Sequence, residues 1–329
     1  MADLRFDPVS GVWVATARRR RERPMEFIPL EQIHQQIICP FCAGNEDETP
    51  KPVIAYREDG SILGAVDDPS KWMTRIVPNK YPSLIQAAEE GECGPYDRYS
   101  QDGVQELAIP TRRHVASISD LTDVEFMVCL KACQRRVEEL RAMPAIKHVS
   151  LFMNCRSAAG ASMEHIHFQI MGSALLSPFL IDRGQRNQEN IDQKGESLIT
   201  TLVNWELEQK VRVLRETANF VMLCPYASRF AFQVWIVPKR MNLPFSSNGI
   251  NFNSELVELC KFYTERLEGL MENTAYNLLI NLAPTSQMQS EHWFVEIFPR
   301  LNTMAGYEIQ TDVWVNPVPP EMAAKRLLS

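Results

Sequence analysis

The sequence predicts an α+β fold made of two tandem repeats, each an antiparallel sheet with a packed helix. The first observation is a repeated heptapeptide. Residues 164–170 read Glu-His-Ile-His-Phe-Gln-Ile, and residues 291–297 read Glu-His-Trp-Phe-Val-Glu-Ile, with the same first glutamate, first histidine and last isoleucine. The second is that the same succession of strand and helix patterns precedes each heptapeptide. Duplication of one folding unit accounts for both observations.

The matching parts begin with strand patterns at residues 104–110 and 232–238, which run into basic segments. A helix pattern follows each of them, with apolar residues at spacings of three and four. The first helix is expected from Asp120 onward, and the second from Ser254, a good N-cap residue. The residues at 86–103, between the basic N-terminal part and the first strand, are expected to form an exposed loop.

Strand patterns at residues 147–154 and 276–282 come next, and each heptapeptide then follows as a last strand. His165 and His292 lie 127 positions apart, the same offset as between His114 and Met241. We therefore expect a first repeat over residues 1–181, a polar linker over 182–196, and a second repeat over 197–329.

The composition is that of an ordinary globular protein. A length of 329 residues allows two cores, and 45% hydrophobic and 23% charged residues are usual values. A net charge of −7 argues against nucleic-acid binding, which needs a cationic face. No apolar stretch has membrane-spanning length, and the N-terminus does not resemble a signal peptide. Eight dispersed cysteines suggest reduced thiols, so we expect a cytoplasmic protein. From the net charge and the lack of a long apolar stretch, we expect it to bind neither nucleic acid nor membrane.

The first heptapeptide carries the candidate catalytic residues. Alternate residues of a strand face the same side, so His165, His167 and Gln169 should line one face. A neutral imidazole can attack phosphorus and form a phosphoramidate. Two core histidines with satisfied hydrogen bonds are the alternative, but three polar residues on one face favour function. The small, polar turn before them would let a ligand approach the backbone, and its candidate binding residues are Asn154, Gly160 and Ser162.

A second constellation is the Cys-x-x-Cys segment of Cys39 and Cys42, which is typical of half a zinc site. A redox pair or two buried thiols are the alternatives. Two further ligands are needed for a closed site, and His114 and His165 are the best candidates. In that arrangement His165 holds one structural zinc ion and His167 is left as the nucleophile.

The second repeat tests this assignment. It retains His292, but Met241 and Phe294 replace His114 and His167. A rougher alignment places Ser197 and Thr200 opposite the two cysteines. We therefore expect the second repeat to lack metal and nucleophile and to act as a scaffold or binding surface.

The chain resembles galactose-1-phosphate uridylyltransferase, of the histidine-triad superfamily, over nearly its whole length. The cysteine segment and the His-x-His-x-Gln segment are the specific features, whereas the end of the chain resembles the bacterial and plant branch that includes ADP-glucose phosphorylase. The other supporting segments are Arg20–Pro24, Val77–Pro82 and residues 306–308. The resemblance implies that each repeat is a half-barrel of the histidine-triad type.

The resemblance also implies a ping-pong nucleotidyl transfer. His167 would attack the α-phosphorus of a nucleotide sugar, and Gln169 would donate to the non-bridging oxygens. A sugar 1-phosphate would then take the nucleotide, by default galactose 1-phosphate reacting after UDP-glucose. Residues matching nucleotide contacts are Arg20, Arg23 and Asn79. Residues matching the hexose-binding tail, which the family takes from the neighbouring subunit of a homodimer, are Tyr307 and Glu308.

The chain departs from the family pattern at several positions. Ile166 replaces the usual proline, and Phe294 and Glu296 stand where well-known members hold a second metal, so one zinc ion is expected. Three alternatives remain: an ADP-glucose phosphorylase that uses inorganic phosphate, a histidine-triad hydrolase, and a zinc-binding protein without catalysis. Gln169 counts against the hydrolase, because a neutral amide cannot shuttle a proton.

Overall fold

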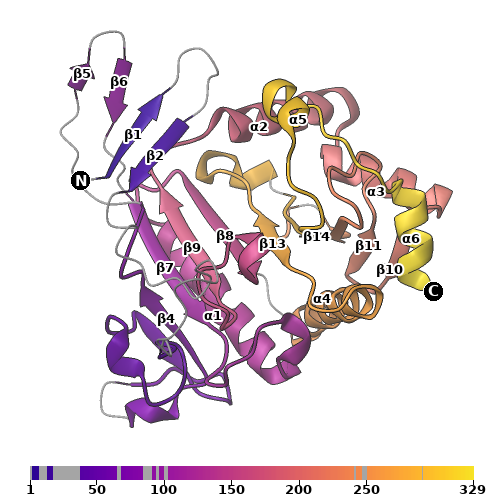
Figure 1. Ribbon diagram of the computed structural model, residues 1–329. Helices are drawn as coiled ribbons and strands as arrows, with labels where there is room; N and C mark the ends of the chain where they lie inside the picture. Colours follow the sequence, from indigo (N-terminus) through magenta and orange to yellow (C-terminus); the bar gives the residue numbers. More distant parts are fainter. Residues whose placement is uncertain are drawn as a thin grey trace.

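The structure is a computed structural model that describes residues 2–6, 13–17, 38–64, 68–83, 91–93, 96–99, 103–240, 242–246, 250–290 and 292–329. Its largest element is a 10-stranded sheet (Figure 1). The strands are β3 (Ile54–Tyr56), β4 (Thr74–Pro78), β7 (Gly103–Ile109), β8 (His148–Cys155), β9 (Phe168–Ser173), β10 (Val213–Glu216), β11 (Phe220–Leu223), β12 (Val234–Pro238), β13 (Tyr276–Asn281) and β14 (Phe294–Pro299).

The two repeats form two halves of this one sheet. The strand order is β10-β11-β12-β14-β13-β8-β9-β7-β4-β3, and all neighbours are antiparallel. The halves meet where β8 pairs with β13, with Phe152 opposite Leu279 and Asn154 opposite Asn277. Each half has three strands, a helix and two strands, so the predicted succession of a strand, a helix and two strands is present in both and is preceded by two further strands. The repeated α+β architecture is therefore confirmed, and the two repeats share one continuous sheet.

Helices α1 (Asp123–Arg141) and α4 (Ile250–Leu270) pack against one face of the sheet and against each other (Figure 1). Thr122 and Glu125 form a capping box at the start of α1, which satisfies two backbone N–H groups. The helix α4 begins at Ile250, one turn before Ser254, so the predicted N-cap is wrong. These helices enclose the main core, and two smaller apolar clusters, one in each repeat, lie on the opposite face.

The polar stretch expected to be a linker is helical instead. Helix α2 (Pro178–Lys194) covers most of residues 182–196, and α3 (Leu198–Gln209) follows at once. Ser177 caps α2, and Gly195 ends it in the left-handed conformation, with φ of 76°. Arg183 of α2 donates to Asn281 and to the carbonyl of Leu282, so polar contacts dock this helix on the sheet. The exact repeat boundaries remain a prediction.

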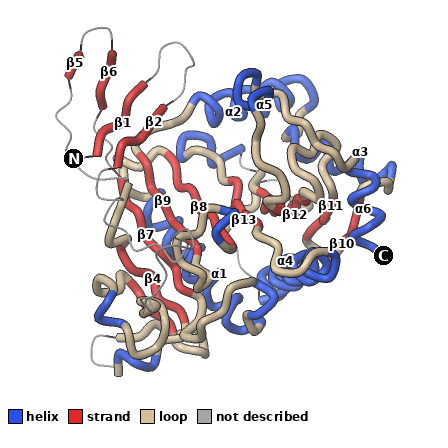
Figure 2. The backbone as a smooth tube through the Cα atoms, in the orientation of Figure 1, coloured by secondary structure: helices blue, strands red, loops and turns tan. Residues whose placement is uncertain are grey.

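The remaining elements lie around this framework (Figure 2). A 4-stranded sheet contains two strands within residues 86–103, so the loop expected there is partly wrong. Its order is β2-β1-β6-β5, with β1 (Ala2–Phe6), β2 (Trp13–Ala17), β5 (Gly91–Cys93) and β6 (Tyr96–Tyr99). Among the described segments, no helix has the length and apolarity needed to cross a bilayer. The other helices are η2 (Glu46–Glu48), η3 (Pro69–Lys71), η4 (Ile118–Asp120), η5 (Ser157–Ala159), η6 (Thr285–Ser290), α5 (Gly306–Thr311) and α6 (Pro320–Leu328).

Candidate active site

The two histidines of the first heptapeptide lie immediately before a strand. Strand β9 begins at Phe168, so the prediction that the whole heptapeptide is a strand is wrong at its first half. The backbone N–H of Ile166 donates to the carbonyl of Val115, which keeps this part of the chain extended. Ile166 and Phe168 are buried in the main core, as the alternation predicted, and His167 is also buried.

A backbone contact determines the tautomer of His167. Its Nδ1 lies 2.9 Å from the carbonyl oxygen of His165. A carbonyl oxygen only accepts, so Nδ1 carries the proton and the imidazole lone pair lies on Nε2. The ring of Phe41 packs against His167 with the centroids 5.1 Å apart. The imidazole is thereby held in one orientation, with its lone pair on Nε2.

The predicted metal ligands converge although they come from three distant segments. The ligand atoms of Cys39, Cys42, His114 and His165 all lie within 4.8 Å of one another. Nδ1 of His165 is 3.5 Å from Sγ of Cys39 and 3.6 Å from Sγ of Cys42, and Nδ1 of His114 is 3.4 Å from Sγ of Cys42. Four ligand atoms at such mutual distances could hold one tetrahedral metal ion.

The chemistry of this cluster also fits a cation. His165 is fully buried, and burial lowers its pKa to about 4, so its imidazole is neutral as a metal ligand must be. Nε2–H of His165 donates to the carbonyl of Thr111, 3.1 Å away, which directs the Nδ1 lone pair at the thiols. Burial raises the pKa of Cys39 to about 12, and a bound metal ion would reverse this shift by stabilising the thiolate.

The small, polar turn lies between β8 and the histidines. Oγ of Ser162 is buried and has no hydrogen-bond partner among the described residues, which is unusual unless a ligand supplies one. Gly160 has φ of 89°, in the left-handed region, and its N–H donates to Ser157 within the turn. The amide of Asn154 is oriented by Asn277, whose Nδ2 donates to its Oδ1 at 2.8 Å.

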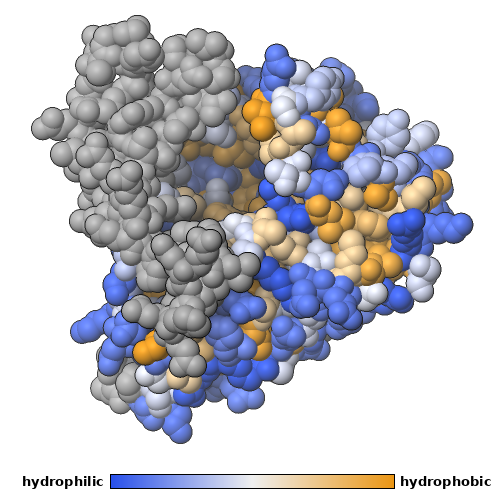
Figure 3. Space-filling model, in the orientation of Figure 1, coloured by the Kyte–Doolittle hydropathy of each residue, from blue (hydrophilic) through white to orange (hydrophobic). Residues whose placement is uncertain are grey.

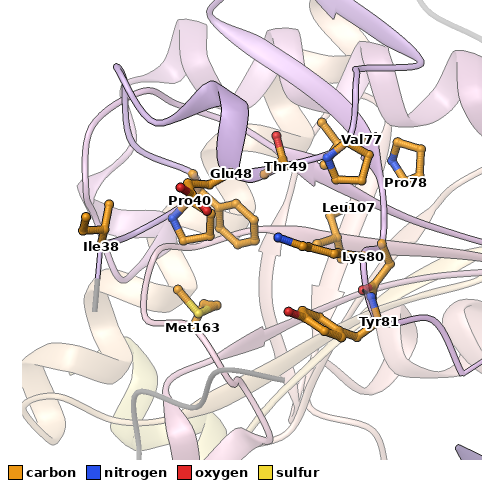
Figure 4. A pocket seen from close by; sticks show the side chains of 13 residues that line it. Ile38, Pro40, Glu48, Thr49, Val77, Pro78, Lys80, Tyr81, Leu107 and Met163 are labelled. Carbon is orange, nitrogen blue, oxygen red and sulfur yellow. Dashed lines mark hydrogen bonds between the residues drawn. The ribbon is translucent and has the colours of Figure 1, made fainter. Parts of the chain in front are cut away.

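A cavity of about 130 Å³ is lined by Phe41, whose ring also packs against His167. Asn79, a predicted nucleotide contact, lines it, and its Oδ1 accepts from the N–H of Tyr81. Lys80 extends across the cavity, with Met163 below it in the view of Figure 4. The apolar walls and few polar groups are typical of a site for a flat organic group. The other lining residues are Ile38, Pro40, Glu48, Thr49, Pro50, Val77, Pro78 and Leu107.

Of the four remaining predicted substrate contacts, the structure describes Tyr307 and Glu308. Arg20 and Arg23 lie outside the described residues. Glu308 lines a separate small cavity beside Arg229 and Trp314, on the second repeat. Tyr307 is 55% exposed. The described chain therefore brings His167, the Cys/His cluster and the small, polar turn together, whereas Tyr307 and Glu308 lie over the other half.

Three contributions were not recognised in the sequence. Phe41 both lines the cavity and contacts His167, the Thr111 carbonyl orients His165, and Asn277 of the second repeat orients Asn154. Phe41 lies between Cys39 and Cys42, so its place in the sequence already indicated that it would lie near the cysteine and histidine cluster. The contacts of Thr111 and Asn277 depend on long-range packing and had no local signal.

The counterpart of the metal cluster in the second repeat is a hydrogen-bonded group. Nδ1 of His292 lies 2.9 Å from Oγ of Ser197 and 3.2 Å from Oγ1 of Thr200, and its Nε2 donates to the carbonyl of Pro238 at 2.7 Å. The rough alignment of Ser197 and Thr200 with the cysteines is therefore confirmed. Met241 lies outside the described residues, and Phe294 occupies the position of His167 in an apolar cluster.

The fold and this arrangement are similar to those of histidine-triad proteins. Residues 104–174 match the family model of the HIT domain, and this segment contains His114, the small, polar turn, His165, His167 and Gln169. The match stops before the second repeat.

Relatives over almost the whole chain make the class more specific. The chain is 28% identical to ADP-glucose phosphorylase of Arabidopsis thaliana over 98% of its own length and 91% of that protein. It is 24% identical to galactose-1-phosphate uridylyltransferase of Thermotoga maritima, over 99% and 98%. A crystal structure of the Arabidopsis ADP-glucose phosphorylase with bound ADP-glucose matches with a TM-score of 0.75 and 26% identity, over 100% and 99%. The chain is thus an enzyme related to these uridylyltransferases and to ADP-glucose phosphorylase.

Proposed function

We propose that this enzyme transfers a nucleoside monophosphate between phosphate groups through a covalent intermediate on His167. Nε2 of His167 attacks the α-phosphorus of a nucleotide sugar, a P–N bond forms, and the P–O bond to the sugar 1-phosphate breaks. The proton on Nδ1 stays in its hydrogen bond to the His165 carbonyl throughout. The observation that carries the proposal is this hydrogen bond, because it makes Nε2 the nucleophile.

The second half-reaction reverses the first with a different acceptor. A phosphate oxygen of the acceptor attacks the same phosphorus, and the P–N bond breaks. Gln169, a buried residue of β9 two positions after His167, would donate to the non-bridging oxygens as their charge is redistributed. The unpartnered hydroxyl of Ser162 and the oriented amide of Asn154 are suited to the same phosphoryl group. As an amide, Gln169 cannot deliver a proton, which favours transfer over hydrolysis.

The cavity beside Phe41 would hold the nucleotide base, with Asn79 on its wall. The first candidate reaction converts UDP-glucose and galactose 1-phosphate into glucose 1-phosphate and UDP-galactose. The second is phosphorolysis of ADP-glucose by inorganic phosphate. Relatives named for each of the two reactions match nearly the whole chain, at 28% identity for the Arabidopsis protein and 24% for the Thermotoga protein, so both reactions are candidates.

We propose that the Cys39, Cys42, His114 and His165 cluster holds one structural zinc ion. Four protein ligands close the coordination shell, so zinc would fix the loops that carry Phe41 and the histidines. The seven described cysteines are free thiols, which fits a reducing compartment such as the cytoplasm.

A homodimer would place the tail of one copy near the active site of the other. Apolar side chains on the C-terminal segment are exposed, as the orange groups over this region of Figure 3 show. Burial against a second copy would remove this surface from water. The exposed residues are Leu301, Met304, Tyr307, Ile309, Val313 and Val315.

The experiment is a labelling assay without acceptor. The enzyme is incubated with UDP-glucose or ADP-glucose labelled in the α-phosphate, and acid-labile, base-stable label on the protein is measured. We expect label on the wild type and none on His167→Ala. The matched control is Phe294→Ala, the equivalent change in the second repeat, which should still be labelled. Equal labelling of wild type and His167→Ala would disprove the mechanism.

Adding galactose 1-phosphate or inorganic phosphate to the labelled protein then identifies the acceptor. The acceptor that removes the label, together with the nucleotide that supplied it, distinguishes the two candidate reactions.

A further inference from the structure

The turn between β8 and His165 is held in place by residues of the second repeat. We propose that Arg156 and Asn277 are positioning residues through which the second repeat sets the geometry of the catalytic turn. The inference rests on the proposed nucleotidyl transfer, and it gives the repeat without a nucleophile a direct part in that reaction.

Arg156 has a backbone conformation that is rare for any residue with a side chain. Its φ of 66° and ψ of 167° lie in a region that glycine occupies almost alone. In this conformation its carbonyl accepts the N–H groups of Ala159 and Ala161, both at 3.2 Å. These two bonds close the turn that leads to Ser162. The unusual conformation of Arg156 therefore shapes the segment that presents the unpartnered hydroxyl.

The side chain of Arg156 is anchored in the second repeat. Nη1 donates to the carbonyl of Thr274 at 2.9 Å, and Nη2 donates to Oδ1 of Asn273 at 3.3 Å. Glu268, near the end of α4, lies 3.8 Å from Nη1. Thr274 and Asn273 belong to the connection between α4 and β13. A strained conformation persists only where its surroundings enforce it, and these contacts supply that enforcement.

Asn277 of β13 holds the same turn from its other side. It is buried, and its Nδ2 donates to Oδ1 of Asn154 at 2.8 Å and to the carbonyl of Ala159 at 2.9 Å. Because Oδ1 of Asn154 is an acceptor here, its Nδ2 must point toward the turn, where it lies 3.5 Å from the Gly160 carbonyl. The side chain of Asn277 thus orients Asn154, a candidate hydrogen-bond donor to the phosphate, and also fixes the backbone of the turn.

These contacts predict an effect on the transition state more than on ground-state binding. Donors aimed at a phosphoryl group stabilise it only when they are held in place, and a misplacement of about 1 Å can cost about 100-fold in rate. Loss of the anchors should lower kcat while KM changes little, because the cavity walls, apart from Met163, belong to other segments. A change confined to kcat separates positioning from simple loss of fold.

The test uses variants of the full-length, metal-loaded enzyme in single-turnover labelling of His167 with UDP-glucose or ADP-glucose. Arg156→Gly accepts the backbone conformation and removes the anchor, so it should fold with a wild-type melting temperature. We expect its maximal labelling rate to fall about 10- to 100-fold, with half-saturation almost unchanged. Asn277→Asp, which replaces the donor by an acceptor, should behave alike. Arg156→Lys should recover part of the rate, because its ammonium can still reach the Thr274 carbonyl.

The matched control is Arg215→Ala, which removes another Arg–Glu pair of the second repeat, at 3.0 Å from Glu258 and away from the turn. It should label at the wild-type rate. Wild-type rates in folded Arg156→Gly and Asn277→Asp, or a raised half-saturation with unchanged maximal rate, would overturn the inference. If either Arg156→Gly or Asn277→Asp does not fold, the labelling rate of the other variant tests the inference. Absence of label on the wild type would instead reject the proposed function.

Discussion

The two repeats build the same small cluster with different chemistry. In the first, Nδ1 of His165 faces the thiols of Cys39 and Cys42 while its Nε2 donates to the carbonyl of Thr111. In the second, Nδ1 of His292 faces two hydroxyl groups while its Nε2 donates to the carbonyl of Pro238. Both histidines precede the same strand of their repeat by a few residues.

The difference shows what the shared backbone contributes and what the side chains add. Hydroxyl groups can satisfy a buried imidazole by hydrogen bonds alone, whereas a pair of thiols beside two histidines favours a metal ion. The second cluster also caps a helix, since Ser197 accepts from the N–H of Thr200 at the start of α3. The two histidines therefore occupy the same structural position in their repeats. Of the two described clusters, only the one around His165 has residue types that could hold a metal ion.

The largest effect should come from removing a ligand of the first cluster. Structural zinc contributes about 10 kcal/mol or more in small zinc-dependent domains, so we expect Cys39→Ser to cost several kcal/mol. Ser197→Ala, the matched change, should cost about 1 kcal/mol, the value of a helix cap and one hydrogen bond. Denaturant unfolding together with bound zinc per chain measures both. Equal losses in the two variants would mean that the first cluster is also only a hydrogen-bonded joint.

The next contrast concerns the last polar position of the heptapeptides, Gln169 and Glu296. Gln169→Glu would set a negative charge beside the phosphoryl group, and we expect kcat to fall about 100- to 1000-fold. Glu296 is buried and accepts from Arg229 at 3.0 Å and from Gln233. Glu296→Gln should cost about 1–2 kcal/mol of stability and leave kcat unchanged. Steady-state kinetics and thermal unfolding of both variants separate the two roles.

If Glu296→Gln slowed the reaction as strongly as Gln169→Glu, the second repeat would contain a working site. The comparison would then fail at the position where the chemistry of the two repeats differs most.

Much of this arrangement could be predicted because its signals are local. The spacing of the cysteines and the alternation around His167 are each visible within one short segment, and the repeat is visible by comparing two such segments. The structure brings the cysteines and histidines together as expected. The pairing of β8 with β13 had no such signal, because it depends on contacts between strands more than a hundred residues apart.

The errors have equally specific causes. The linker at residues 182–196 stays a prediction, but its helical conformation was missed, because it depends on the cap at Ser177 and on the docking of Arg183. The heptapeptide alternates like a strand throughout, yet His167 bonds to the carbonyl two residues before it, and the ladder starts only at Phe168. The conformation of Arg156 was not predictable, because nothing in the residue itself favours it.

The smallest effect concerns how the two clusters respond to acid. Burial lowers the pKa of His292 below its ordinary value, and the hydrogen bond to Pro238 offsets this only in part. The unfolded chain therefore takes up a proton near pH 6.5 before the folded chain does, so stability falls as the pH drops below that value. The loss for one histidine cannot exceed about 1.4 kcal/mol per pH unit. Unfolding free energies of wild type and His292→Asn between pH 7.5 and 5 should converge as the pH falls.

In the first repeat, the same acidification should act through the metal instead. A ligated His165 stays neutral until protons displace the ion, so zinc release, and not a gradual loss of stability, would mark its titration. Measuring free zinc across the same pH range distinguishes the two behaviours. A constant difference in stability between wild type and His292→Asn would show that His292 titrates alike in both states, and burial would then not be what keeps this imidazole neutral.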